Sequence, residues 1–533
     1  MNRFYESLVL LTGLREVHHR NGQTRAPSDA EPSESPSRTF ECFVNKLAQV
    51  CDSRRGGDTV TSLAILRHPD RLQYVFASNQ RNAKDIEKTS EFVYSLLYYV
   101  GSRGPQPESP GGDDSSTMFR HLLRNILNFN SKRIRYYAKG LAGHLGNCIA
   151  DCERDDSSDA SLPTERESLV RAATVLLASP TYGRIVDRAK IGRIDQSLHW
   201  SELEHFIGRL ASYIKAVQAI MGARKRFPEL FEVDGFEVQF VASSTPLPNP
   251  MMAFQAGLPP IQRRSARPAH DIISRMTSDK DKIATYRHYA EELQRCGLDD
   301  RIAEQCGKPL FQPVVHSEIL LLEWLLDEYA EETHSVPFYG DVKYIGCSKP
   351  TCRLCDCYFA AHNSGIRARP PHPNVYANWT IPAILDESDG EASREKTRMV
   401  DTVLGKIRED AFREMREKVS ERKRFDSNTD SSLPTFQSHA SVLANLDDLS
   451  SQISGLSIAS RERYLHRVIK GKAPAGDDAW SVVAEEGGAE NRSGREVNGD
   501  KGKGEDEDDD DGGGVIVFSG RKMRFISAGP RVY

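Results

Sequence analysis

The spacing of a few potential metal ligands constrains this chain more than any other feature of its sequence. His316 stands two residues before Glu318, at the start of an apolar helical stretch at 319–329, and Cys352 and Cys355 follow further along the chain. A zinc ion that takes part in catalysis keeps three protein ligands and leaves a fourth position for water. His316, Cys352 and Cys355 can supply these three ligands, so the fold must bring them together.

Helix geometry decides where each of these side chains can lie. Residues two apart on an ideal helix point about 200° apart, so we expect His316 at the very start of its helix, where the long Glu318 side chain still reaches inward. Cys352 and Cys355 lie three apart and share one face in the first turn of the next predicted helix. The positive end of the helix dipole in that turn favours the thiolate forms that bind zinc.

Glu318 is the candidate catalytic residue. Zinc lowers the pKa of a bound water to about 7, which makes a nucleophile available. A carboxylate that is not a ligand must then move protons from that water to the substrate. Glu318 is placed for this role because it lies two residues from His316.

These residues resemble the signature of the zinc-dependent cytidine and nucleic-acid deaminase superfamily, H-x-E followed by P-C-x-x-C. The Ser348-Lys349 pair before the C-x-x-C looks like the branch that is found widely in fungi and is related to bacterial deaminase toxins. The T-V-T strand at 59–61 and a second strand that ends at Asn79 also look like this branch. The resemblance implies a Zn²⁺ cofactor and a nucleobase substrate, either within nucleic acid or as a nucleotide.

The resemblance also implies substrate contacts. In relatives, an Asn at the position of Asn79 contacts the sugar or the base, and the alternative is an ordinary turn residue. Ser348 and Lys349 flank the proposed metal site and are the other two candidates. Four cations near the metal ligands can meet phosphates: Lys349, Arg353, Arg367 and Arg369.

Two features depart from the superfamily pattern. Pro350 stands two residues before Cys352 instead of immediately before it. A long, mainly helical region at 85–304 separates the hairpin from His316, where most relatives have a short link. We therefore expect a domain that is split by a large helical insertion.

The alternation of helical and strand patterns predicts an α/β fold, a deaminase-like three-layer α/β/α sandwich with a disordered C-terminal tail. β-forming runs at 59–66 and 72–79 flank a His-Pro-Asp turn and predict a hairpin. A stable sheet needs at least three strands, so we expect the hairpin to join a strand at 342–346. A further strand or hairpin is expected at 231–244.

Composition and pattern divide the chain into six segments. Ordered structure is expected to begin near Thr39, after a Pro/Ser/Glu-rich linker, and the charged stretch after residue 390 is expected to be a solvated helix. The segments are 1–38 (N-terminal segment and linker), 39–84 (helix and β-hairpin), 85–304 (helical insertion), 305–385 (zinc-binding core), 390–425 (charged helix) and 426–533 (mostly disordered acidic tail).

Two other classes of protein fit the same residues. In a structural zinc protein, four ligands drawn from the cysteines at 347, 352, 355 and 357 and from His362 would close the site. In a catalytically inactive binding module, the fold is kept without turnover. Glu318 favours the enzyme, because a purely structural site has no use for a carboxylate that is not a ligand.

Overall charge says little about partners. A net charge of −5 gives the whole chain no electrostatic preference for nucleic acid. The cations and aromatics at 132–137 are typical either of single-strand binding or of an ordinary helix surface. No stretch approaches the roughly 18 to 20 apolar residues of a membrane helix, and the N-terminus makes a poor export signal. We expect an intracellular protein, cytoplasmic or nuclear, with protein partners bound through the helical region or the acidic tail.

Overall fold

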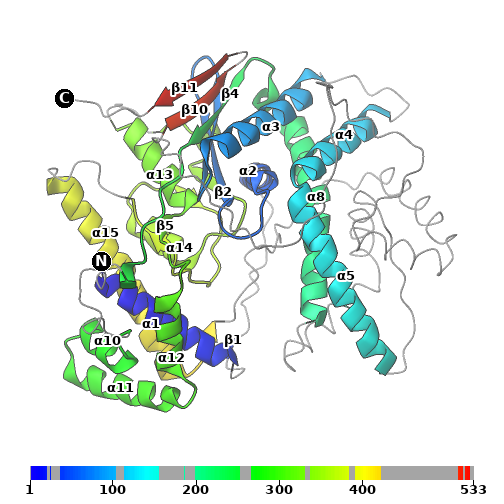
Figure 1. Ribbon diagram of the computed structural model, residues 1–533. Coiled ribbons are helices and arrows are strands. Elements are labelled where there is room, and N and C mark those ends of the chain that lie inside the picture. Colours follow the sequence, from blue (N-terminus) through cyan, green and yellow to red (C-terminus); the bar gives the residue numbers. More distant parts are fainter. Residues whose placement is uncertain are drawn as a thin grey trace, which may run out of the picture.

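A mixed β-sheet forms the centre of the molecule (Figure 1). In the computed structural model, the strands from β4 onward are, in spatial order, β4 (Phe236–Val241), β3 (Leu72–Ser78), β2 (Thr61–Arg67), β6 (Tyr344–Cys347) and, at the edge, β7 (Arg367–Ala368). Strand β2 is antiparallel to both β3 and β6, whereas β3 and β4, and likewise β6 and β7, are parallel. The structure describes residues 2–20, 24–25, 36–103, 113–154, 185, 199–252, 266–330, 336–382, 390–421, 514–519 and 522–527.

Strands β2 and β3 form the predicted hairpin. Their register runs from Thr61 opposite Ser78 to Arg67 opposite Leu72. Nearly every residue of both strands is buried, as in sheets that are covered on both faces. Because β2 also pairs with β6, the hairpin and the strand before the zinc-type cysteines share one sheet, which confirms that prediction.

Alternate side chains along β2 enter two separate apolar cores, one on each face of the sheet. Leu63 and Ile65 join one core, and Ala64 and Leu66 join the other. The predicted three-layer α/β/α arrangement is therefore confirmed. The first face is covered by α2 (Pro36–Cys51) and α3 (Ala83–Ser102), and the second by α13 (Ser317–Glu328) and α14 (Arg353–Ala361).

The region predicted as a helical insertion is divided between the two faces. Its first part packs on α2, and the chain then returns to the sheet as β4, which lies inside this region and pairs with β3. Its last part packs against other helices on the opposite face. The first part contains α4 (Asp113–Phe129), α5 (Ser131–Arg154), α8 (His199–Arg226) and the 3₁₀ turn η1 (Pro228–Phe231), and the last contains α10 (Ala269–Met276), α11 (Lys280–Gln294) and α12 (Leu298–Gly307).

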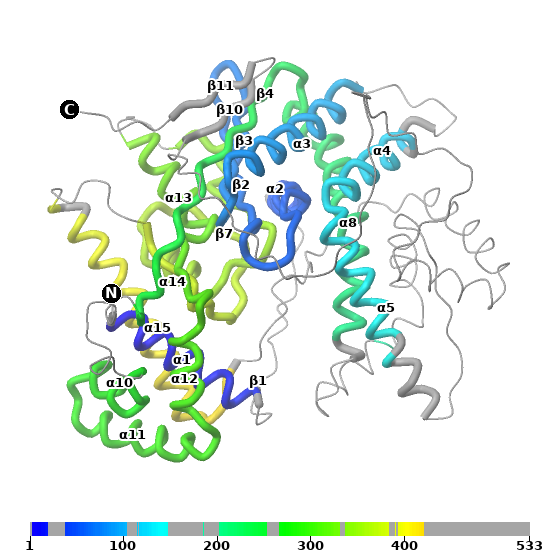
Figure 2. The backbone as a smooth tube through the Cα atoms, viewed as in Figure 1, coloured from blue at the N-terminus to red at the C-terminus, as the bar shows by residue number. Residues whose placement is uncertain are grey.

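Ordered structure begins before Thr39, so that expectation is wrong. Helix α1 (Asn2–Arg20) lies in the core of the second face, where Leu8 and Leu14 are fully buried. It packs against α10, α12 and α15 (Gly390–Glu417), as Figure 2 shows. Helix α2 also begins earlier than predicted, at Pro36.

Helix α15 is not the solvated helix that its charge predicts. A stripe at every fourth position is buried against α1 and its neighbours, while most charged residues occupy the other faces. Asp410 and Glu414 are also buried, and each forms an ion pair with an arginine from another element. A short parallel pair, β1 (Thr24–Arg25) with β9 (Ser420–Glu421), continues this contact. The stripe consists of Met399, Val403, Ile407, Ala411 and Met415.

The predicted acidic tail lies largely outside the described residues. Within the described part, the backbone of β10 (Gly514–Ser519) and β11 (Lys522–Ser527) forms an antiparallel pair, and β10 extends the sheet beyond β4. Among the helices that the structure describes, none combines the length and the apolar character that crossing a membrane would need.

The close approach of α2 to β6 gives a testable prediction. A Cβ atom at Gly346 would lie 2.6 Å from Val44 Cγ1 and 3.1 Å from the Asn45 backbone nitrogen. We expect Gly346→Ala to lower the free energy of unfolding by about 1–3 kcal/mol through overpacking. Urea denaturation of the full chain measures the change.

Gly208, in α8, is the matched control because a Cβ there meets nothing within 4 Å. Gly208→Ala should leave the protein as stable or raise its stability by about 0.5–1 kcal/mol. Equal stability of the Gly346→Ala variant and the wild type would contradict the packing described for this strand.

Candidate metal centre

His316 lies at the position that the sequence predicts, at the N-terminus of α13. It is the N-cap residue, with extended backbone angles of φ −70° and ψ 148°, and its carbonyl oxygen accepts the Leu320 N–H at 2.9 Å. The preceding strand β5 (Val314–Val315) pairs in parallel with β8 (Trp379–Thr380). This pairing fixes the chain just before His316.

The two cysteines lie at the N-terminus of α14, as predicted. Cys352 is the N-cap residue, and its Sγ accepts the Cys355 backbone N–H at 3.5 Å. Both side chains are buried. The first turn of α14 thus presents two sulfur atoms and the positive end of a helix dipole to one point.

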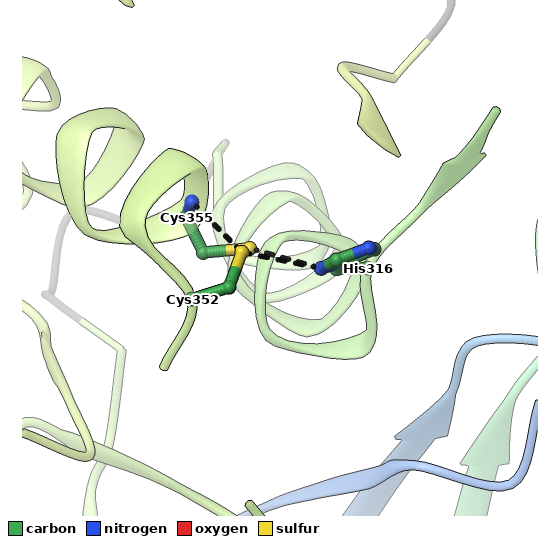
Figure 3. A group of neighbouring side chains, drawn as sticks. All are labelled: His316, Cys352 and Cys355. Carbon is green, nitrogen blue, oxygen red and sulfur yellow. Dashed lines mark hydrogen bonds between the residues drawn. The ribbon is translucent and has the colours of Figure 1, made fainter. Parts of the chain in front are cut away.

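The two sulfur atoms, from the first turn of α14, point toward His316 at the start of α13 (Figure 3). Cys352 Sγ and Cys355 Sγ each lie 3.5 Å from His316 Nδ1, and the three ligand atoms lie within 4.8 Å of one another. Ligands at ordinary Zn–S and Zn–N distances in a tetrahedron are about 3.6 Å apart. The donor set and its spacing therefore fit a zinc ion.

The structure argues against a closed site with four protein ligands. In the described part of the chain, the group that can hold a metal contains His316, Cys352 and Cys355 and no fourth side chain. His362 Nε2 instead lies 3.8 Å from Glu323 Oε1. A tetrahedral ion held by this group keeps one open position, as catalytic zinc sites do.

Glu318 is buried beside this group, with 3% of its surface exposed. Its Oε2 accepts a hydrogen bond from Ser317 Oγ at 3.3 Å. Burial raises the pKa of Glu318, and the neighbouring His316 opposes this effect. A carboxyl group that is kept away from water takes up a proton more readily, which is a property of groups that transfer protons.

The electrostatics of the cysteines depend on the same contacts. Burial alone would raise the pKa of Cys352, but the hydrogen bond with Cys355 and the nearby His316 lower it well below its ordinary value. The pKa of Cys355 is raised by burial. Trp379 Nε1 donates to Cys355 Sγ at 3.4 Å, so a residue that is not itself a candidate ligand supports this sulfur.

Trp379 was not predicted to belong to the site, because its contact with Cys355 depends on the pairing of β5 with β8, between segments far apart in the chain. Tyr376 was not predicted either, although its ring centre lies 6.3 Å from that of His316. Both residues follow a Pro-rich segment that carries no ligand motif. The signal that could have identified them is the presence of two aromatic residues, Tyr376 and Trp379, within 25 residues after Cys355.

Asn79 is brought to the first turn of α13. Its Oδ1 accepts the Ser317 backbone N–H at 2.7 Å, and its Nδ2 donates to the Gly57 carbonyl at 2.9 Å. The residue therefore connects the hairpin to the helix that carries Glu318. Its contact with substrate stays a prediction.

Ser348 and Lys349 lie between β6 and α14. Ser348 Oγ accepts the Thr61 backbone N–H at 3.1 Å, so this side chain is bonded to the hairpin. Lys349 is partly exposed, and its Nζ donates to the Gly56 carbonyl at 3.1 Å. Their roles toward substrate also stay predictions.

The other three candidate phosphate contacts are engaged within the protein. Arg353 Nε donates to Asp410 at 3.0 Å, and Arg367 Nη2 donates to Glu41 at 2.8 Å. Arg369 is buried and donates to a backbone carbonyl. Lys349 is also hydrogen-bonded within the protein, but its partner Gly56 lies next to Gly57, whose carbonyl accepts Asn79. Of the four cations, Lys349 therefore fits the predicted phosphate contact best.

The fold and the site together define a deaminase-type domain, in which a His/Cys/Cys group lies where two helices begin on one face of a mixed sheet. Residues 315–383 match a family model described as OTT_1508_deam-like deaminase, and this part of the chain is a deaminase-family domain. Such domains usually bind zinc. The match covers a small part of the chain, and the fungal or toxin-related branch stays a prediction. No curated protein and no solved structure matches the chain.

Single substitutions of the cysteines test the ligand set. Cys352→Ser and Cys355→Ser should lose bound zinc, because the group then lacks a thiolate. Cys347→Ser and Cys357→Ser should retain it, because these residues are not part of the group. Elemental analysis of purified protein measures zinc per chain, and zinc loss in either control variant would indicate a closed site.

Trp379 offers a finer test of the same centre. Trp379→Phe removes the donor to Cys355 Sγ but keeps an aromatic ring against the Phe4 ring, which stacks on it at 5.6 Å. Losing such a hydrogen bond to a ligand typically lowers metal affinity about 10- to 100-fold. Competition with a zinc chelator measures the affinity, and an unchanged value would show that this contact does not support the ligand.

Proposed function

We propose that this protein is a zinc-dependent hydrolytic deaminase that acts on a nucleobase, either within nucleic acid or as a nucleotide. One observation carries the proposal: an open three-ligand group, His316, Cys352 and Cys355, with Glu318 buried beside it. The deaminase-family match at 315–383 supports the same reading.

His316, Cys352 and Cys355 would hold Zn²⁺, which when bound supplies an activated water at neutral pH. Glu318 takes a proton from the attacking water and delivers it to the ring nitrogen of the base. Glu318 then takes the second proton from the hydroxyl group that has added to the ring carbon and passes it to the exocyclic amine, so that the C–N bond breaks, a carbonyl forms and ammonia leaves. The buried position of Glu318 keeps bulk water from competing for these protons.

The same proposal assigns roles to the residues around the site. Asn79, Ser348 and Lys349 contact the substrate, with Lys349 directed at its phosphate. We propose an intracellular location, cytoplasmic or nuclear, because such a substrate is found there. Protein partners bound through the helical region or the acidic tail belong to the same proposal.

The two rival functions make different demands on Glu318. A structural zinc protein needs four ligands and no additional buried carboxylate. A binding module keeps the fold but does not depend on proton transfer. Substitution of Glu318 therefore separates an enzyme from both rivals.

Glu318→Gln should abolish deamination while zinc content and melting temperature stay near wild-type values. The amide keeps the size of the side chain but cannot exchange the proton, and general acid–base catalysis of this kind contributes about 10²- to 10⁴-fold. Ammonia release is measured on cytidine, adenosine, their monophosphates, and single- and double-stranded DNA and RNA.

Two further variants complete this experiment. Glu328→Gln, at the exposed end of the same helix, should keep full activity and controls for a changed helix charge. His316→Ala should lose zinc as well as activity. An active wild type whose Glu318→Gln form keeps full turnover would rule out the mechanism, and a wild type that releases no ammonia from any of these substrates would favour the binding module.

A further inference from the structure

A buried ion pair joins the helical region to the core of the deaminase-type domain. Arg133, in α5, places its Nη1 2.7 Å from Asp52 Oδ2, and the same nitrogen donates to the Asp52 carbonyl. Arg133 Nε donates to the Tyr137 hydroxyl at 2.5 Å. The two charged side chains are 7% and 2% exposed. The guanidinium group is thus held in one orientation by a carboxylate, a carbonyl and a phenol.

Asp52 begins the loop 52–60 that connects α2 to β2. Thr59 Oγ1 donates to Asp52 Oδ1 at 2.8 Å, so this hydrogen bond links the first residue of the loop to its second-to-last residue. Asn130, at the junction of α4 and α5, donates to the Val50 carbonyl at 2.9 Å just before the loop. Two side chains from the helical region therefore hold this segment.

The loop in turn contacts two of the predicted substrate-binding residues. The Gly57 carbonyl accepts Asn79 Nδ2 at 2.9 Å, and the Gly56 carbonyl accepts Lys349 Nζ at 3.1 Å. Asn79 continues the connection to the Ser317 amide in the first turn of α13. A continuous chain of contacts thus runs from α5, through the loop, to the helix that carries Glu318.

A small cavity lies along this connection. It has a volume of about 10 Å³, roughly the space of one water molecule, and its lining is mainly polar. Asp52, Arg133 and Ser348 line it together with side chains of α2, α5 and α8. The helical region therefore borders Ser348 directly as well as the loop.

We propose that Arg133 is a positioning residue: through Asp52 it sets the conformation of loop 52–60 and so places Asn79 and Lys349 at the metal centre. The significance of this placement for substrate rests on the proposed function. The alternative is an ion pair that only stabilises the fold. A buried ion pair is by itself weak evidence that it stabilises the fold. This pair includes the first residue of the loop that contacts Asn79 and Lys349.

Hydrogen exchange of the full-length, zinc-loaded protein tests the proposal without a substrate. Arg133→Lys keeps the charge but loses the forked geometry, and Tyr137→Phe removes only the phenol that orients Arg133. Both variants should raise amide exchange in residues 52–60 and at Ser317 by about tenfold or more, as expected for local opening. Exchange in α12, on the far side of the sheet, and zinc content should not change.

Arg135→Lys is the matched control, because Arg135 is exposed on the same helix. It should leave exchange at wild-type rates throughout. Unchanged exchange in loop 52–60 of the Arg133 variant, or an equal rise in this loop and in α12, would overturn the proposal in favour of a merely structural pair.

Activity measurements extend the test to substrate binding. In an active wild type, Arg133→Lys should raise KM more than it lowers kcat, since the loop contacts Asn79 and Lys349 directly and is linked to the helix of Glu318 only through Asn79. A fall in kcat with unchanged KM would contradict this role. A wild type that releases no ammonia refutes the proposed function, and the exchange result still decides whether Arg133 positions the loop.

Discussion

The meeting of two helix N-termini at one point is the constraint on which the site depends. His316 and Cys352 are both N-cap residues, so the positive ends of α13 and α14 lie beside the same group of candidate ligands. Their partial positive charges favour thiolates in a place where burial opposes any charge. The helices meet there because both pack on one face of the sheet and because β5 and β8 fix the chain beside them.

The clustering of the three candidate ligands could be predicted because helix periodicity acts over a few residues. Two cysteines three apart must share a face, and a histidine two residues from a glutamate must lie at a helix end if both are to face one point. Trp379 could not be predicted, because its contact with Cys355 depends on strand pairing across the chain. The hairpin was predictable from two β-forming runs that flank a turn. Strand β4 was predictable only as a single strand, because its pairing with β3 joins segments far apart in the chain.

Helix α1 escaped prediction for a different physical reason. Nearly all of its residues from Phe4 to Leu14 are buried, so it lacks the polar face that marks an amphipathic helix. Its one acidic residue in this stretch, Glu6, is neutralised by Arg267 and Arg275 from a distant segment. A charge that argues against burial in the sequence is therefore compatible with burial in the fold.

The place of α1 has a consequence for how the protein is made. Arg15 forms a 2.8 Å ion pair with Glu414, and the Tyr5 hydroxyl donates to the Trp379 carbonyl at 3.3 Å. At translation rates of about 5–20 residues per second, α1 waits roughly 20 to 80 s for the partners that cover it. Over that interval the apolar helix lacks the contacts that α15 and β8 provide, and its contacts behind the candidate metal site form only after these segments have been made.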